Sequence, residues 1–409
     1  MRKKLVKNSL LLIVSQIIAR SIGLIYFIFL ARNLSVSNFG IYAWVLGFVY
    51  NFFPVADFGL ERYVLKYIPR NRSKTNFYFK RILGLKSALA IFAIFACLAL
   101  ALVLGISSPK FILLSIFALH LIPYNIAHTI ITFQNAKEET TTYAKFNICY
   151  SLLGAILGVF VIKLKLGLPW VFGAYFATIS LVLVWLITKK NMLKIGFVFD
   201  RNFFKKVLKE SWVYAFLVIM AVFYLRIPLI LTGILTDDYW AGIYGSVSKF
   251  IEAGILIPQA VALALAPSYS ILLEKKKKEL GRVYLKNMFT VFLLSLPIVL
   301  LMFFVSQPII LLIYGQAYSS AITTFSLLGV VMGLLFVNSL AGNIIQNSQK
   351  VKKFIPYALF KFFTVTAACL FLIPKMGIIG GAWAMIGGEI FGLVINNTFV
   401  YKILKEKGN

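Results

Sequence analysis

The sequence predicts an all-α integral membrane protein, with twelve transmembrane helices arranged in two parallel six-helix lobes around a central cavity. Three observations carry this prediction. Of the 409 residues, 61% are hydrophobic and only 13% are charged; long apolar windows recur along the chain; and Lys and Arg gather in alternate connections. A soluble domain is about 45–50% apolar and about 25% charged, so most of this chain is expected to lie in a bilayer.

A helix needs about 20 consecutive apolar residues to cross a hydrocarbon core about 30 Å thick. Twelve windows of the sequence meet this requirement: 10–31, 39–60, 82–105, 110–134, 143–162, 167–188, 212–235, 240–272, 286–313, 320–345, 354–373 and 378–401. The first window is too long for the apolar part of a signal peptide and carries Arg20 at its centre. We therefore expect it to remain as the first spanning helix.

The net charge is +29, and the basic residues are distributed unequally between the two sides of the membrane. If the N-terminus is cytoplasmic, 32 of the 42 Lys and Arg residues lie in the cytoplasmic termini and connections, five lie in the opposite connections, and the other five lie inside windows. This asymmetry is the positive-inside rule and predicts a multi-pass protein of the cell membrane with both termini cytoplasmic. A basic surface that reads nucleic acid would need soluble elements to carry it, so no nucleic-acid partner is expected.

The windows divide six and six at a polar cytoplasmic segment. We predict an N-terminal lobe over 1–188, a basic cytoplasmic linker over 189–211 and a C-terminal lobe over 212–409. An even number of spans in each half gives a parallel repeat about an axis normal to the bilayer. Short matches link helices with the same place in each half: 38–45 with 240–247, 131–138 with 343–350, and 166–175 with 376–383.

Within the linker, the segment RNFFKKVLKESW (201–212) has an apolar face and a basic face. Phe203, Phe204, Val207 and Leu208 share the first face, and lysines occupy the second. This pattern fits either a short helix on the anionic cytoplasmic leaflet or a basic linker that only fixes the topology.

The sequence contains few motifs that indicate catalysis or the binding of a cofactor or metal. There is no G-x-x-x-x-G-K-[ST] phosphate loop and no outer loop large enough for an active site, so neither an enzyme nor a cofactor or metal site is expected. The two histidines, His120 and His128, lie eight residues apart on one helix; they are either packing residues or members of a proton relay. Gly388 and Gly392 fit the close-packing motif of membrane helices.

Ionisable residues inside a membrane are expensive and are therefore candidates for function. Those within the windows are Arg20, Asp57, Lys86, Arg226, Lys249, Glu252, Lys361 and Glu389. Lys86 is one turn from the cytoplasmic end of its window and is expected to extend to the interface. Lys249 and Glu252 are three residues apart and are expected to neutralise each other in part.

Five of these residues fall on the first two predicted helices of each half: Arg20, Asp57, Arg226, Lys249 and Glu252. They either line a polar cavity or only pair with one another and clamp the halves together. Three cations against two anions favour an anionic ligand over a closed network of ion pairs.

The run from Leu30 to Tyr67 resembles the N-terminal signature of the polysaccharide and O-antigen flippases, which belong to the multidrug/oligosaccharidyl-lipid/polysaccharide exporter superfamily. The resemblance rests on Ala31-Arg32, Phe39-Gly40-Ile41-Tyr42 and Asp57-Phe58-Gly59-Leu60, and on GIIGGAW at 377–383. It implies two six-helix lobes and a cavity lined by helices 1, 2, 7 and 8. The chain is short for the family and has no additional C-terminal helices.

The activity implied by the resemblance is movement of a lipid-linked (polyprenyl-diphosphate) oligosaccharide from the inner to the outer leaflet by alternating access. Arg20, Arg226 and Lys249 are then expected to bind substrate, and Asp57, Glu252 and Glu389 to couple ions or pair charges. Expected partners are the lipid-linked saccharide, membrane lipids, and polymerase and other surface-polysaccharide assembly proteins. The alternative is a cation-coupled multidrug exporter of the same superfamily, although cationic drugs would favour an acidic cavity.

Overall fold

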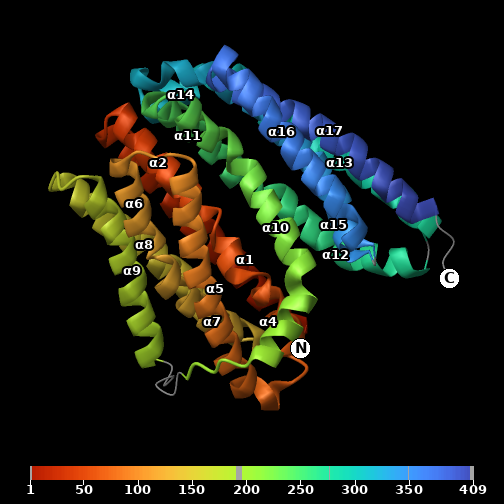
Figure 1. The fold of residues 1–409 in the computed structure, drawn as a ribbon. Helices are drawn as coiled ribbons and strands as arrows, with labels where there is room; N and C mark the ends of the chain where they lie inside the picture. The colour runs from red at the N-terminus through yellow and green to blue at the C-terminus, as the bar shows by residue number, and fades with distance from the viewer. Residues whose placement is uncertain (1, 190–195, 276, 349, 406–409) are drawn as a thin grey trace. The chain divides into compact units, whose positions relative to one another are not determined.

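The computed structural model describes residues 2–189, 196–275, 277–348 and 350–405, and these residues form helices and turns with no strand among them (Figure 1). The prediction of an all-α membrane fold is confirmed in the described residues.

Contacts along the chain divide it into two compact units. Unit 1 comprises Met1–Asn33 and Val45–Val222, and unit 2 comprises Leu34–Trp44 and Phe223–Asn409. The helices α2 and α10 run without a break through a unit boundary, so each contributes residues to both units. The lobes predicted from the repeat, 1–188 and 212–409, stay a prediction, and residues 190–195 of the predicted linker lie outside the described residues.

Unit 1 is built from the N-terminal helices. They are α1 (Arg2–Asn33), the second part of α2 (Val36–Tyr50), α3 (Phe53–Asp57), α4 (Leu60–Tyr67), η1 (Arg72–Lys74), α5 (Thr75–Val103), α6 (Ser108–Ala118), α7 (Leu121–Ala136), α8 (Thr140–Lys163), α9 (Leu168–Lys189) and the first part of α10 (Arg201–Leu235). Helix α1 packs along α8, and α7 packs against α5, α8 and α9.

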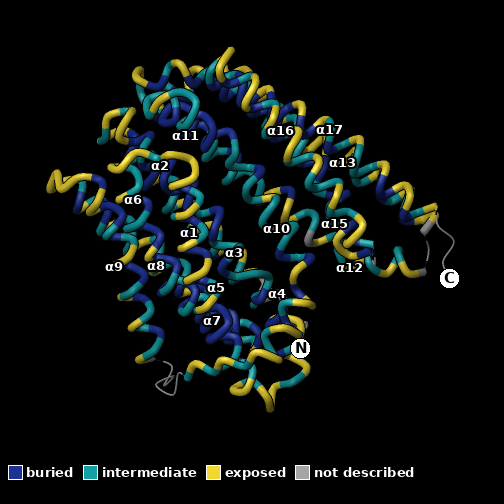
Figure 2. The backbone as a smooth tube through the Cα atoms, viewed as in Figure 1, coloured by how far each residue is buried: buried dark blue, intermediate teal, exposed yellow. Residues whose placement is uncertain are grey.

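Unit 2 holds the remaining helices together with the first part of α2 and the second part of α10. They are α11 (Asp238–Gly254), α12 (Leu256–Lys275), α13 (Lys277–Phe304), α14 (Ser306–Tyr314), η2 (Gln316–Ala321), α15 (Ile322–Asn347), η3 (Val351–Phe354), α16 (Ile355–Met376) and α17 (Ile378–Lys405). Helix α15 is central, because α12, α13 and α17 all pack against it. Exposed residues recur along α13, α16 and α17 (Figure 2), including Phe289 and Phe363, as expected for faces that meet lipid.

Within the part of the chain that the structure describes, eleven helical segments are long and apolar enough to cross a membrane, and the number rises to twelve if the pair Asp238–Ala262 and Ala264–Glu274, bent by 43°, forms one span. The bent pair occupies the predicted window 240–272. The predicted window 286–313 is wrong at its end. Helix α13 stops at Phe304, and α14 begins at Ser306 with Pro308 in its first turn, where a missing N–H costs the helix nothing.

The basic segment 201–212 is not a separate helix on the leaflet, and its role in fixing the topology stays a prediction. It forms the first turns of the 35-residue helix α10 and continues directly into a span. Val207 is fully buried, and Phe203, Phe204 and Leu208 pack with it against a core that includes Phe79 and Phe133. The apolar face therefore meets protein rather than the lipid leaflet.

The connection that leads into α10 is fastened to α5. Arg81 forms an ion pair with Asp200 at 2.9 Å, and the Val198 amide donates to the Lys80 carbonyl at 3.2 Å. Asp200 also accepts a hydrogen bond from the Phe203 amide at 3.0 Å and so caps the start of α10. The Phe203 amide and the Arg81 guanidinium lower the pKa of the Asp200 carboxyl below its usual value.

Two glycines let α2 and α11 approach closely within unit 2. A Cβ atom on Gly40 would meet the Asp238 carbonyl and lie 2.7 Å from the Gly242 nitrogen, and a Cβ atom on Gly242 would meet the Val36 carbonyl and lie 3.2 Å from the Gly40 nitrogen. The contact is reciprocal, since each glycine faces the carbonyl four residues before the other glycine. These glycines also hold the same position in the predicted match of 38–45 with 240–247, and the repeat itself stays a prediction.

Candidate functional site

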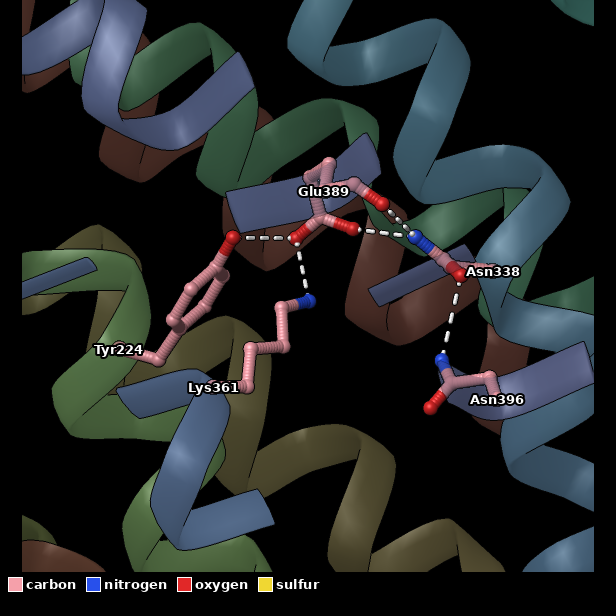
Figure 3. A network of polar contacts seen from close by, with 5 residues as sticks. All are labelled: Tyr224, Asn338, Lys361, Glu389 and Asn396. Atoms are coloured by element: carbon pink, nitrogen blue, oxygen red, sulfur yellow. Dashed lines mark hydrogen bonds and ion pairs between the residues drawn. The ribbon is translucent and has the colours of Figure 1, made fainter. Parts of the chain in front are cut away.

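In unit 2, the carboxylate of Glu389 on α17 is fully buried. Figure 3 shows the side chains that converge on it. Its Oε1 atom accepts a hydrogen bond from the Tyr224 hydroxyl at 2.6 Å and forms an ion pair with Lys361 Nζ at 2.9 Å. Its Oε2 atom accepts from Asn338 Nδ2 at 2.6 Å. Both oxygens are therefore satisfied, as a buried charge requires.

Asn338 extends this network along two helices. Its Nδ2 atom also donates to the backbone carbonyl of Glu389 at 3.0 Å, and its Oδ1 atom accepts from Asn396 Nδ2 at 3.1 Å (Figure 3). Lys361 Nζ lies 4.3 Å from the centre of the Tyr224 ring, a cation–π contact. The network joins α10, α15, α16 and α17, so it stabilises the packing of four helices at one point.

The small residues beside Glu389 make room for this network. A Cβ atom on Gly388 would collide with Val365 and lie 3.0 Å from the Tyr224 hydroxyl. On the next turn, a Cβ atom on Gly392 would lie 2.8 Å from Lys361 Nζ. The close-packing motif predicted at Gly388 and Gly392 is confirmed, and at this place it admits polar side chains as well as a neighbouring helix.

A second cluster of charges in unit 2 is less enclosed. Arg226 Nη2 and Lys249 Nζ each lie 2.8 Å from an oxygen of Glu252, one on Oε1 and the other on Oε2. The three side chains keep 17%, 25% and 27% of their surface exposed. The predicted pairing of Lys249 with Glu252 is confirmed, and Arg226 joins the same carboxylate. Two cations thus meet at one carboxylate in a partly exposed position.

In unit 1, Asp57 lies at the end of α3 and forms an ion pair with Lys86 of α5, with Oδ1 and Nζ 2.6 Å apart. The Lys86 side chain is only 2% exposed. The prediction that Lys86 extends to the membrane interface is therefore wrong, because the nearby Asp57 carboxylate stabilises the ammonium group inside the protein.

The predicted site residues thus fall into separate groups. The structure brings together Arg226, Lys249 and Glu252 in unit 2, and it places Glu389 in its own network with Lys361. Arg20 and Asp57 belong to unit 1. Arg20 is exposed on α1, and its charge acts on Tyr143 of α8. The joint role predicted for Arg20 and Arg226 stays a prediction.

Sequence reasoning missed the neutral members of the Glu389 network, Tyr224, Asn338 and Asn396. Hydroxyl and amide groups are common within membrane helices, and nothing in their spacing sets these three apart. Lys361 is among the ionisable residues found from the sequence, and its pairing with Glu389 could also have been predicted, because a lysine and a glutamate inside consecutive windows are expected to pair.

Comparison with known proteins shows the family to which the chain belongs. Residues 5–270 match the model of a family described as "Polysaccharide biosynthesis protein". The chain belongs to this family. It is also 26% identical over 381 residues to a putative O-antigen transporter of Shigella flexneri, and the match covers 87% of each protein.

Solved structures share the fold of this family member. An inward-facing multidrug resistance MATE family transporter of the MOP superfamily aligns with a TM-score of 0.78 at 13% identity, covering 95% of this chain and 96% of that one. The lipid II flippase MurJ in an inward closed conformation aligns with a TM-score of 0.70 at 15% identity, covering 97% of this chain and 89% of that one. The resemblance expected from the sequence is confirmed: the chain is a multi-pass membrane protein of the polysaccharide biosynthesis protein family, and it has the fold of these transporters.

Proposed function

We propose that this transporter moves a polyprenyl-diphosphate-linked oligosaccharide from the inner to the outer leaflet of the cell membrane, by alternating access, for assembly of a surface polysaccharide. The observation that carries the proposal is the meeting of two cations, Arg226 and Lys249, at Glu252 in a partly exposed position inside a spanning helix pair. A diphosphate is the anionic part of such a substrate. Membership of the polysaccharide biosynthesis protein family and the name of the Shigella flexneri relative support the saccharide part.

Arg226 is the proposed centre of diphosphate binding. A guanidinium is planar and always charged, and it can hold two phosphate oxygens at once, whereas lysine offers only a point charge. Lys249 adds to the field, and Arg20 of unit 1 is proposed to join when substrate is bound. Pro228, two residues beyond Arg226, lies inside α10, where the missing N–H weakens the helix.

The test is surface polysaccharide in cells that lack the wild-type gene and express single variants. Arg226→Ala should abolish the polysaccharide and lead to accumulation of the lipid-linked saccharide, while the variant protein still inserts into the membrane. Arg226→Lys should restore only part of the wild-type amount. Arg72→Ala is the matched control, because Arg72 is 59% exposed and pairs with Glu138 at the surface of unit 1.

The double variant separates substrate binding from simple charge pairing. If Arg226 serves only to neutralise Glu252, then Arg226→Ala combined with Glu252→Ala should recover the activity that the single change lost. Recovery in the double variant would refute the role in substrate binding. Continued loss, with normal insertion, supports it.

We also propose that the membrane potential and ion gradients drive the transport. With an inside-negative potential, moving one negative charge outward is favourable and releases about 2.3 kcal/mol per 100 mV. Asp57, Glu252 and Glu389 are the proposed groups for ion coupling or charge pairing. Transport in vesicles should therefore change with an imposed potential, and indifference to both potential and ion gradients would contradict this proposal.

A cation-coupled multidrug exporter is the alternative within the same superfamily. The two cations around Glu252 are a poor binding site for cationic drugs. Resistance to organic cations in cells that overproduce the protein, with no change in lipid-linked saccharide, would favour the alternative.

A further inference from the structure

The connection 196–200, which leads into α10, lies across the surface of α5 in unit 1. The Val198 amide donates to the Lys80 carbonyl at 3.2 Å, and a Cβ atom on Gly84 would lie 2.7 Å from the Val198 oxygen. Because Gly84 has no side chain, the backbone of the connection packs directly on the helix there. Together with the ion pair that Asp200 makes to the same helix, these contacts fix the connection to α5.

Two phenylalanines of this connection point away from α5. Exposure alternates along the chain: Phe197 and Phe199 are 47% and 67% exposed, whereas Val198 between them and Asp200 after them are half-buried. Successive side chains of an extended chain lie on opposite sides, and Val198 lies on the side of the helix. The fixed backbone therefore keeps both aromatic rings at the surface of unit 1.

The face of α5 that the connection crosses continues as a face that meets lipid. Ala88, Phe92 and Phe95 follow Gly84 at helical spacing, and all three are exposed. A hydrocarbon core is crossed by about 20 helical residues. Counted back from Val103, which is 83% exposed at the far end of α5, this length ends at Gly84. The connection therefore lies at the level of the lipid headgroups, on the side predicted to be cytoplasmic.

Cations lie at both ends of the pair of rings. The Lys80 side chain runs beside Gly196, with Nζ 3.6 Å from a Cβ atom built on that glycine. Arg201 and Lys205 follow the rings along the chain, one turn apart at the start of α10, and both are exposed. Within the described residues, no carboxylate forms an ion pair with any of these three cations. Three unpaired positive charges thus lie beside two exposed rings.

An anionic phospholipid has the chemistry that matches both parts of this surface. Its phosphate would meet the cations, and its glycerol and upper acyl chains would lie against the rings, as apolar and basic side chains do at an anionic leaflet. A free phosphate would use only the cations. A zwitterionic phospholipid would bring its own cation toward them, so it matches the surface less well.

We propose that Lys80, Arg201 and Lys205, with the rings of Phe197 and Phe199, form a binding site on unit 1 for the headgroup of an anionic phospholipid. The site shares no residue with the proposed substrate-binding group around Arg226. It does not rest on the proposed function, and it can be measured on the protein without a saccharide.

A photoreactive phospholipid tests the proposal on the full chain. The purified protein is placed in phosphatidylcholine nanodiscs that contain a small fraction of phosphatidylglycerol with a photoreactive group beside its headgroup, and labelled peptides are identified by mass spectrometry. Peptides that contain 196–205 should be labelled more than the other segments at the same membrane surface. A phosphatidylcholine probe with the same group should show no such preference. Even labelling of all these segments, or equal preference by both probes, would overturn the proposal.

Charge variants test the cations. Lys80→Ala and Arg201→Ala should each weaken binding of the phosphatidylglycerol probe about fivefold, the effect of one basic residue near an anionic membrane surface. Lys163→Ala, which removes an exposed lysine at the end of α8, is the matched control and should leave labelling of 196–205 unchanged. Unchanged labelling in both test variants would overturn the proposal. So would displacement of the probe by dissolved glycerol phosphate, because a lipid site needs the acyl chains as well.

A variant without a change of charge separates a built site from a basic surface. Gly84→Ala adds a methyl group that must displace the Val198 carbonyl, so labelling of 196–205 should fall severalfold although every cation remains. Gly173→Ala is the matched control, because a Cβ atom on Gly173 has no atom within 4 Å. Phe197→Ser combined with Phe199→Ser should also lower the labelling. If Gly84→Ala and the double variant are both labelled like the wild type, only general attraction to basic residues acts, and the proposed site is refuted.

Discussion

Single side chains decide whether charges can stay inside this membrane protein. Glu389 keeps its charge in a fully buried position because Tyr224, Lys361 and Asn338 all donate to it. Arg226 and Lys249 contact the two oxygens of Glu252. The first arrangement places donors on both oxygens of a fully buried carboxylate, whereas the second brings two cations together in a partly exposed position. The two clusters are therefore suited to different tasks, packing in one case and ligand binding in the other.

Lys361→Met should destabilise the protein strongly, because Glu389 would remain buried with its only cationic partner in the network removed. Breaking a buried ion pair on one side costs about 3–5 kcal/mol. Adding Glu389→Gln should recover most of this loss, since the amide carries no charge. Denaturant unfolding of the purified protein in detergent measures both changes, and Lys375→Met, at the end of α16, serves as the control. If Lys361→Met has the same free energy of unfolding as the wild type, the ion pair contributes little to stability.

Helices are placed by small residues at the points where they meet. Along α17, Gly388 faces Val365 and Tyr224, whereas Gly387 has no atom within 4 Å of a Cβ built on it. Position 388 therefore has no room for a larger side chain, whereas position 387 has room, although both are glycines that are adjacent in the sequence.

Gly388→Ala should lower stability by about 1–3 kcal/mol through overpacking. Gly387→Ala should be neutral or stabilising by up to about 1 kcal/mol, because Ala is the better helix former. Thermal unfolding of the two variants in the same detergent gives a direct comparison. Equal melting temperatures would contradict the packing described for α17.

The sequence alone predicts much of this fold, for reasons visible in particular segments. Apolar windows located the spans because the bilayer imposes one length on every crossing helix. The limit at 286–313 is wrong because hydropathy does not register the break between α13 and α14 at Val305. The surface that the apolar face of 201–212 meets could not be predicted, because such a face fits lipid and protein equally well. Among the site residues, Arg226 and Glu252 were recognisable as charges inside spanning windows, but which carboxylate each cation meets depends on helix rotation.

At the scale of the whole molecule, the distribution of Lys and Arg predicts which side each connection faces. A reporter fused after Thr236, at the end of α10, should be active outside the cytoplasm. A reporter fused after Lys278, near the start of α13, should be active inside it. The same side for both reporters would contradict the predicted topology, and with it the parallel arrangement of the two halves.

The contact between Gly40 and Gly242 has a consequence for how such a chain could arise. Two helices that meet through equivalent residues, each against the same carbonyl of the other, form what between separate subunits would be an isologous interface. A surface of this kind is complementary to itself, so one half could have paired with a second copy before the two were joined in a single gene. The joined chain keeps this requirement for glycine, because a methyl group added to Gly40 or to Gly242 would collide with the backbone of the other helix.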